Sequence, residues 1–260
     1  KHVMFDCGPS TTSKLAKAGM TAGMIDELYF THHHFDHNAD YPCFLLSRWD
    51  QSIDDSNPLK VFGPDYTQEF TRRLMDEDVG AFAPDWIARI NHPLSLNAHK
   101  KRGGSLPRKP PKIDVSDMVA GDELRSKDWR ISTAAAHHVQ PWLESLAYRL
   151  DSDEGSIVVT GDTGPCESVV ELATGADAMV SICTYVQGDI EGTPEASYQC
   201  GSIDVAKMAQ AAGVSTLILV HQVHMLDEPG QMERALRDIS HYFDGKVVWG
   251  QELMSFDVAT

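Results

Sequence analysis

Histidine and aspartate residues stand directly after the ends of several predicted strands in this 260-residue chain. Short apolar runs bounded by Gly, Pro, Asn or Asp predict these strands, and segments with helical periodicity lie between them. Such alternation is typical of layered α/β folds. The groups that follow the strands are Asp6, His32–His37, His137/His138, Asp162 and His221. Because loops at strand ends carry function on a rigid scaffold, we expect these groups to converge on one metal site.

The densest of these groups lies in the segment Thr31–Asp40, which reads THHHFDHNAD. Histidine is the commonest metal ligand, but adjacent side chains of an extended loop point in opposite directions. His32 and His34 can therefore share one metal ion. His33 points away from that ion, and we expect it to pack against the protein or to lie at the surface.

The same segment continues with Asp36 and His37. After a turn, these two side chains can reach a second ion close to the first. The pattern H-x-H-x-D-H thus offers nitrogen ligands to one ion and mixed oxygen and nitrogen ligands to the other. Such ligands suit zinc, and iron or manganese are alternatives.

Downstream residues can complete both ion sites. Asp162 lies in TGDTG, where the flanking glycines allow a close approach of the backbone, and this suits a bridging carboxylate. A histidine from the segment AAAHHVQP would complete the first site, and His221 would complete the second.

These motifs resemble the metallo-β-lactamase superfamily in THHHFDH, the GDT turn and the late histidine after a strand. FDCG near the start and LAYRLD before VVTGDTG resemble its ribonuclease Z and arylsulfatase-like branch. The resemblance extends from Asp6 to the C-terminal GQELM. It implies an α/β fold, the four-layer αββα metallo-β-lactamase sandwich, in a single domain over residues 1–260. It also implies that the first strand or two precede Lys1.

The resemblance further implies the ligand set. One ion would be bound by His32, His34 and His138, the other by Asp36, His37 and His221, with Asp162 between them. We prefer His138 to His137 because it adjoins the VQP loop, and His221 to His224 because it ends the strand TLILV. The resemblance suggests that Asp6 orients a metal-binding histidine.

Two divalent ions about 3.5–4 Å apart lower the pKa of a bridging water. We therefore expect a metal-dependent hydrolase with two ions, most simply zinc, whose metal-bridging hydroxide attacks a carbonyl or phosphoryl centre. Asp36 is the candidate residue for orienting the attacking water. His224 is the candidate proton donor for the leaving group.

Two substrate classes compete for this site. The first is a small-molecule ester, lactone or related bond, and the alternative is RNA, cleaved by a ribonuclease Z-type phosphodiesterase that processes the 3′ ends of transfer RNA. The formal net charge of −16 favours the small molecule, since proteins that bind nucleic acid by phosphate contacts usually carry basic patches. A non-hydrolytic relative is a third class, but the full ligand set favours hydrolysis.

Residues 80–111 are rich in Pro, Gly, Asn and basic side chains. We predict a loop without regular structure that forms an insertion or lid facing the substrate. The alternative is that this segment only packs on the surface. The whole insertion is the candidate for the basic, Gly-rich arm that the resemblance implies for a transfer-RNA-processing enzyme, but its prolines indicate a packed rather than an extended segment. Its basic run, His99–Lys112, is a candidate basic patch whose simpler interpretation is a solvated loop. From the last predicted histidine ligand onward this chain reads HQVHMLDEPG, which differs from the sequence that transfer-RNA-processing enzymes usually have there.

The remaining composition bears on location and assembly. Five dispersed cysteines without C-x-x-C spacing indicate free thiols in a reducing, cytoplasmic compartment. The sequence has no apolar run of roughly eighteen residues, so it predicts no membrane span. The resemblance makes a homodimer an expectation, and we expect Trp142 and Tyr148 to be packing residues.

Overall fold

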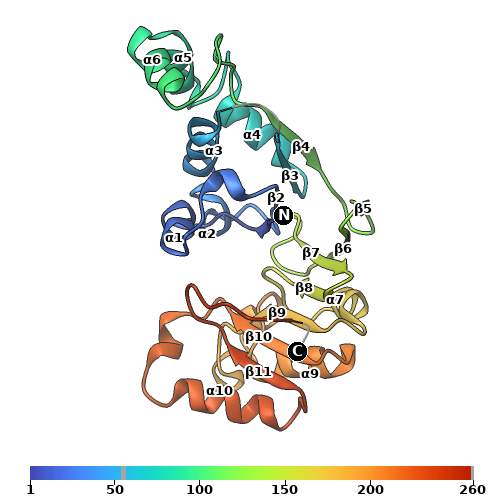
Figure 1. Cartoon of the computed structure of the whole chain (residues 1–260). Coiled ribbons are helices and arrows are strands. Elements are labelled where there is room, and N and C mark those ends of the chain that lie inside the picture. The colour runs from blue at the N-terminus through green and yellow to red at the C-terminus, as the bar shows by residue number, and fades with distance from the viewer. Residues whose placement is uncertain (54–56, 259–260) are drawn as a thin grey trace. The chain divides into compact units, whose positions relative to one another are not determined.

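The computed structural model describes residues 1–53 and 57–258. The chain divides into two compact units, Lys1–Met118 and Val119–Thr260. In Figure 1 the first unit runs from blue to green and the second from yellow-green to red. Each unit has its own sheet and its own hydrophobic core.

The first unit is built on a four-stranded parallel sheet. Its strands, in spatial order, are β1 (Val3–Phe5), β2 (Glu27–Tyr29), β3 (Leu59–Gly63) and β4 (Ile113–Asp117). In the register of the sheet Phe5 pairs with Tyr29, and Tyr29 pairs with Phe62. The carboxyl ends of β1 and β2 therefore lie next to each other. Asp6 and the histidine segment follow these two ends.

Helices pack on this sheet and enclose the core of the first unit. They are α1 (Thr11–Lys17), η1 (Ala22–Met24), α2 (Phe35–Asn38), α3 (Tyr41–Gln51) and α4 (Thr67–Met75). Leu28 and Phe30 from the β2 region, Val61 from β3 and Phe44 from α3 are all fully buried in one cluster. Burial of such side chains is the main stabilising contribution to a fold of this kind. It fixes the strand from which the histidine segment leaves.

The prediction of a structureless loop over residues 80–111 is wrong. Two helices occupy most of this segment, α5 (Ala83–Asn91) and α6 (Pro93–Lys101). Pro84 and Pro93 lie in the first turns of these helices, where a missing N–H group costs no helical hydrogen bond. Trp86 anchors α5, since it is buried and donates its indole N–H to the carbonyl of Met75 over 3.0 Å.

The second unit contains a seven-stranded mixed sheet, in the order β11-β10-β9-β8-β7-β6-β5. Its strands are β5 (Glu123–Arg125), β6 (Trp129–Ala135), β7 (Leu146–Ser152), β8 (Gly155–Val159), β9 (Ala178–Ile182), β10 (Thr216–Val220) and β11 (Lys246–Trp249). Strands β5 to β8 pair antiparallel and β8 to β11 pair parallel. Because β8, β9 and β10 are parallel, the loops after β8 and β10 leave the sheet at the same edge.

One face of this sheet is covered by helices. The helical segments of the unit are α7 (Glu167–Ala173), α8 (Gln187–Ile190), η2 (Pro194–Ser197), α9 (Ser202–Ala212), η3 (His224–Asp227) and α10 (Gln231–Ser240). Val205, Ala206 and Ala209 of α9 are fully buried against Met179 and Leu217 of the sheet. The small alanines allow a close helix-to-sheet approach. This packing makes the strand ends that carry Asp162 and His221 rigid.

Of the two aromatic side chains that we predicted to be packing residues, only one is buried. Tyr148 in β7 is fully buried, as predicted, but Trp142 is 85% exposed. The turn between β6 and β7 places the neighbouring Leu143 partly inward instead.

Within residues 1–53 and 57–258, the structure contains no helix long and apolar enough to cross a membrane.

Candidate metal centre

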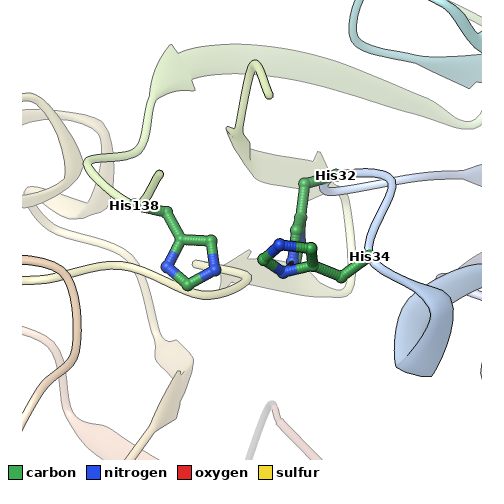
Figure 2. A group of neighbouring side chains, drawn as sticks. All are labelled: His32, His34 and His138. Carbon is green, nitrogen blue, oxygen red and sulfur yellow. Dashed lines mark hydrogen bonds between the residues drawn. The ribbon is translucent and has the colours of Figure 1, made fainter. Parts of the chain in front are cut away.

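The loop after β2 brings two imidazoles together. His32 is fully buried, and its Nε2 lies 3.0 Å from Nδ1 of His34. Nδ1 of His32 lies 3.0 Å from the hydroxyl of Thr31. Figure 2 shows the rings of His32 and His34 turned toward one another, and it draws His138 on the loop that follows β6. Ligand nitrogens of a tetrahedral zinc lie about 3.3 Å apart, so the two ring nitrogens are spaced as two ligands of one ion would be.

His33 points away from this pair, as predicted. Its Nε2 lies 2.8 Å from the hydroxyl of Thr67, and its ring packs against Phe30 at a centroid distance of 5.3 Å. Burial lowers the pKa of His33 to about 4, although Asp117 and Asp65 act in the opposite direction. His33 is therefore a neutral packing residue at physiological pH.

The third histidine of the segment that we assigned to metal, His37, lies on the short helix α2 together with Asp36. Its Nδ1 lies 2.8 Å from Oδ2 of Asp6, and its Nε2 lies 3.4 Å from Oδ2 of Asp36. The centroids of the His32 and His37 rings are 4.1 Å apart. The first unit thus gathers all four of its predicted ligands, His32, His34, Asp36 and His37.

Asp6 connects the end of β1 to this histidine segment. Besides His37, its carboxylate accepts hydrogen bonds from the backbone N–H of Thr31 over 2.7 Å and from the Thr31 hydroxyl over 2.9 Å. Asp6 has a φ of 61°, in the left-handed region that non-glycine residues seldom adopt. Such strain persists only where the surrounding contacts hold it and is common at functional sites. The three hydrogen bonds provide those contacts.

In the second unit the predicted ligands gather around one carboxylate. Asp162 follows β8 and is almost completely buried. Its Oδ2 lies 3.3 Å from Nε2 of His221 and 3.8 Å from Nε2 of His138. Gly161, directly before it, has a φ of 59°, which glycine adopts without strain. Asp162 therefore lies between the histidine assigned to one ion and the histidine assigned to the other.

The structure distinguishes the adjacent histidines of the loop after β6. His138 is buried, its Nδ1 lies 3.0 Å from the carbonyl oxygen of Tyr198, and its backbone N–H donates to Oε1 of Gln140 over 2.9 Å. His137 is exposed, and its backbone bonds to Thr163 and Gly164. His138 is thus the histidine placed beside Asp162.

His221 and His224 also occupy different places. His221 directly follows β10, has a φ of 60° and points its Nε2 at Asp162. His224 is exposed and opens η3, three residues further on. A left-handed backbone at His221 resembles that of Asp6, since both are strained residues at strand ends.

Some contacts that hold these ligands have no local sequence signal. The carbonyl of Tyr198 is 60 positions from His138, and the hydroxyl of Thr31 is an ordinary loop group. Neither could have been selected from composition or spacing. Only the aspartate at position 6 carried a signal, through its place after a strand.

The set of donors fits divalent metal ions. His37, His138 and His32 are each held through Nδ1 by an oxygen atom of the protein, and each directs Nε2 toward another candidate ligand. Metal-binding histidines are typically oriented in this way through the second ring nitrogen. Imidazole nitrogens with carboxylate oxygens suit zinc, manganese or iron.

Sequence comparisons find a family model and relatives that match most of this chain. The family model described as the metallo-beta-lactamase superfamily matches residues 1–221. Ribonuclease Z of Mycobacterium bovis (strain BCG / Pasteur 1173P2) is 30% identical over 263 residues, which cover 98% of this chain and 87% of that protein. Ribonuclease Z of Mycobacterium avium (strain 104) is 31% identical over 258 residues, which cover 96% and 85%.

Solved structures share the fold at low sequence identity. The metallo-beta-lactamase fold protein YhfI from Bacillus subtilis superposes with a TM-score of 0.70 and 18% identity, over 96% of this chain and 84% of that one. The short form of human tRNase Z superposes with a TM-score of 0.63 and 16% identity, over 96% and 85%. At these identities the likeness concerns the fold alone.

Proposed function

Because this chain belongs to the metallo-β-lactamase superfamily, we propose that it is a metal-dependent phosphodiesterase of the ribonuclease Z type. The chain has the metallo-β-lactamase fold, as predicted, and it is a metal-dependent hydrolase. The proposal concerns the bond that it cleaves, a phosphodiester in RNA, and the residues that do so. Precursor transfer RNA is the first substrate to test.

The relatives favour RNA over the small-molecule ester or lactone that we had preferred. Ribonucleases Z align with 98% of this chain, so the likeness is not confined to the metal ligands. The net charge of −16 that argued against nucleic acid is unevenly distributed. Residues 83–112 carry seven basic side chains and one acidic side chain, a net charge of +6. A polyanion is attracted by local charge rather than by the sum over the chain.

The ligand assignment from sequence is retained as part of this proposal. One divalent ion, zinc in the simplest case, would be held by His32, His34 and His138, the other by Asp36, His37 and His221, and Asp162 would be shared. When bound, such ions make hydroxide available near neutral pH and neutralise charge on a phosphoryl oxygen. The support comes from each unit separately. In the first unit the two histidine ligands of one ion converge, and in the second unit Asp162 lies between the ligands of the two ions.

Side chains of the protein would orient the attacking water and protonate the leaving group. The side chain of Asp36 is 40% exposed, so it can accept a hydrogen bond from the attacking water while it faces His37. The leaving alkoxide of RNA needs a proton, because its parent alcohol is a weak acid. His224 is exposed beside the strand end that carries His221 and is our candidate for the donor. Asp6 keeps Nε2 of His37 directed at the site.

The position of Asp162 between His138 and His221 is the observation on which this proposal depends most. The proposed function is tested by assaying five substrates in parallel. They are a small phosphodiester, an aryl ester, a lactone, a β-lactam and a precursor transfer RNA. We expect cleavage of both phosphodiester substrates, with the precursor cut near its 3′ end. Turnover of the ester or lactone without cleavage of either phosphodiester would return the assignment to a small-molecule hydrolase.

A further inference from the structure

A cavity of about 250 Å³ lies within the first unit, away from its metal-ligand segment. It is formed by the end of α3, by α6 and by the loop that leads from α6 toward β4. The side chains that matter for its chemistry are Trp49, Ser52, His99, Ser105, Arg108 and Lys109. Its volume accommodates a small organic ion and excludes a folded polymer.

Two of the side chains that line this cavity, Arg108 and Lys109, are cationic, and Arg108 belongs to an ion-pair group around Asp50 just outside the lining. Asp50 is the acceptor for three guanidinium groups: Arg108 at 2.8 Å, Arg102 at 3.2 Å and Arg89 at 3.5 Å. Burial would raise the pKa of Asp50, but the hydrogen bonds and charges of Arg102 and Arg108 lower it to about 2. One carboxylate neutralises only one of the three cations. Arg89 also pairs with Asp85 over 2.9 Å. The group therefore keeps an excess of one positive charge, and the ammonium of Lys109 adds a second.

Arg108 is held in one place by several contacts. Its side chain is only 4% exposed, and its guanidinium lies 4.0 Å from the centre of the Trp49 ring. The Trp49 indole N–H donates to the carbonyl of Lys109 over 3.0 Å. A cation that stacks on an aromatic face and bonds to one carboxylate retains other N–H donors. The wall is thus rigid, and its donors are preorganised.

His99 adds a polar atom that these contacts do not use. The residue is 5% exposed, and among the described residues its Nδ1 has no hydrogen-bond partner. Gly104 lies so close to the ring that an added Cβ would clash with Nε2. Buried polar groups normally have partners, and His99 is one of the residues that line this cavity.

We propose that this cavity binds the phosphate group of a small ligand, independently of the metal centre. Arg108 and Lys109 would neutralise its charge, the hydroxyls of Ser52 and Ser105 would contact its oxygens, and His99 would bond to a group at its inner end. Phosphate fits because the excess charge of the wall matches a dianion and because several donors converge. The phosphate comes either from a free phosphomonoester or from the 5′ end of an RNA.

A fluorescence titration of the metal-loaded protein tests this assignment, because Trp49 forms the wall. Inorganic phosphate, AMP, and an RNA trinucleotide with and without a 5′-phosphate are the probes. We expect a saturable change that is absent in Trp49→Phe. Inhibition of hydrolysis by phosphate reports binding at the metal centre separately. Tighter binding of AMP would identify a small ligand, and tighter binding of the 5′-phosphorylated trinucleotide would identify an RNA end.

Three charge variants separate a built site from general attraction. Lys109→Gln and Arg108→Gln should each weaken phosphate binding at least tenfold, since a hydrogen bond to a charged group contributes roughly 1.5–3 kcal/mol. Lys109 is exposed, so its replacement should fold normally even if that of Arg108 does not. Lys100→Gln removes the same charge from α6 and should change binding less than twofold. Equal effects of Lys100→Gln and Lys109→Gln, or no saturable change in the wild type, would overturn the proposal.

Discussion

Oδ2 of Asp6 lies 2.8 Å from Nδ1 of His37, and this contact joins the end of β1 to the Asp36–His37 part of the metal-ligand segment. Because a carboxylate can only accept there, His37 carries its proton on Nδ1 and presents Nε2 as the ligand atom. The hydrogen bonds from Thr31 hold the same carboxylate in place. The orientation of one proposed ligand is therefore set by a strand neighbour.

Asp6→Asn is the first test of this relationship. We expect metal affinity and activity to fall by about 10–100-fold, the usual cost of losing a residue that orients a ligand. Competition with a chelator measures the affinity. Asp26→Asn is a matched control, since Asp26 bonds to the backbone N–H of His2 and to the side chain of Asn57 in the same unit. Equal metal affinities of the two variants would show that Asp6 does not position His37.

The two adjacent histidines after β6 make a second test. His138→Ala should abolish activity and remove one bound ion, because His138 is buried with its Nε2 facing Asp162. His137→Ala should retain activity within a few-fold, because that residue contributes mainly backbone bonds. Metal content and steady-state rates measure both effects. The reverse pattern would assign the ligand to His137.

The proposed proton donor gives a prediction about leaving groups. His224→Ala should slow cleavage of RNA by about 10²–10⁴-fold, the range typical of a lost general acid. A 4-nitrophenyl diester leaves without needing a proton, so the same variant should cleave it at close to the wild-type rate. The ratio of the two rates, measured for both proteins, is the readout. A uniform loss on both substrates would exclude a proton-donor role.

The group around Asp50 predicts how stability changes with acid. The pKa of this carboxyl is lowered to about 2 in the folded protein, below its unfolded value of about 3.9. Its contribution is therefore complete above about pH 5 and is lost as the pH falls toward 2. Allowing for partial exposure, this loss is about 1–2 kcal/mol. In Asp50→Asn the free energy of unfolding should vary less between pH 5 and 2, as measured by urea denaturation.

The sequence predicted those parts of the fold that depend on local pattern. Strand β10 covers Thr216–Val220, the apolar run TLILV that predicted a strand directly before His221. The helices α5 and α6 were missed because Pro84 and Pro93 were read without regard to their position in the first turn. The short edge strand β5 was also missed, since its residues Glu123–Arg125 carry mostly charge.

The candidate site was predictable to a similar extent. Alternation along the loop correctly separated His33 from His32 and His34. The contacts of His138 with Tyr198 and of Asp6 with Thr31 come from residues distant in sequence, which only the fold brings together. The net charge of −16 was a poor guide to the substrate class, because residues 83–112 carry a local net charge of +6.

The number of metal ions per chain tests most directly whether the two ligand groups form one hydrolytic centre. Elemental analysis of protein purified without chelators should find close to two equivalents of zinc, iron or manganese. Asp162→Ala, which removes the carboxylate between His138 and His221, should bind fewer ions and lose activity while its far-ultraviolet circular dichroism stays unchanged. Fewer than one equivalent in the wild type would contradict the account.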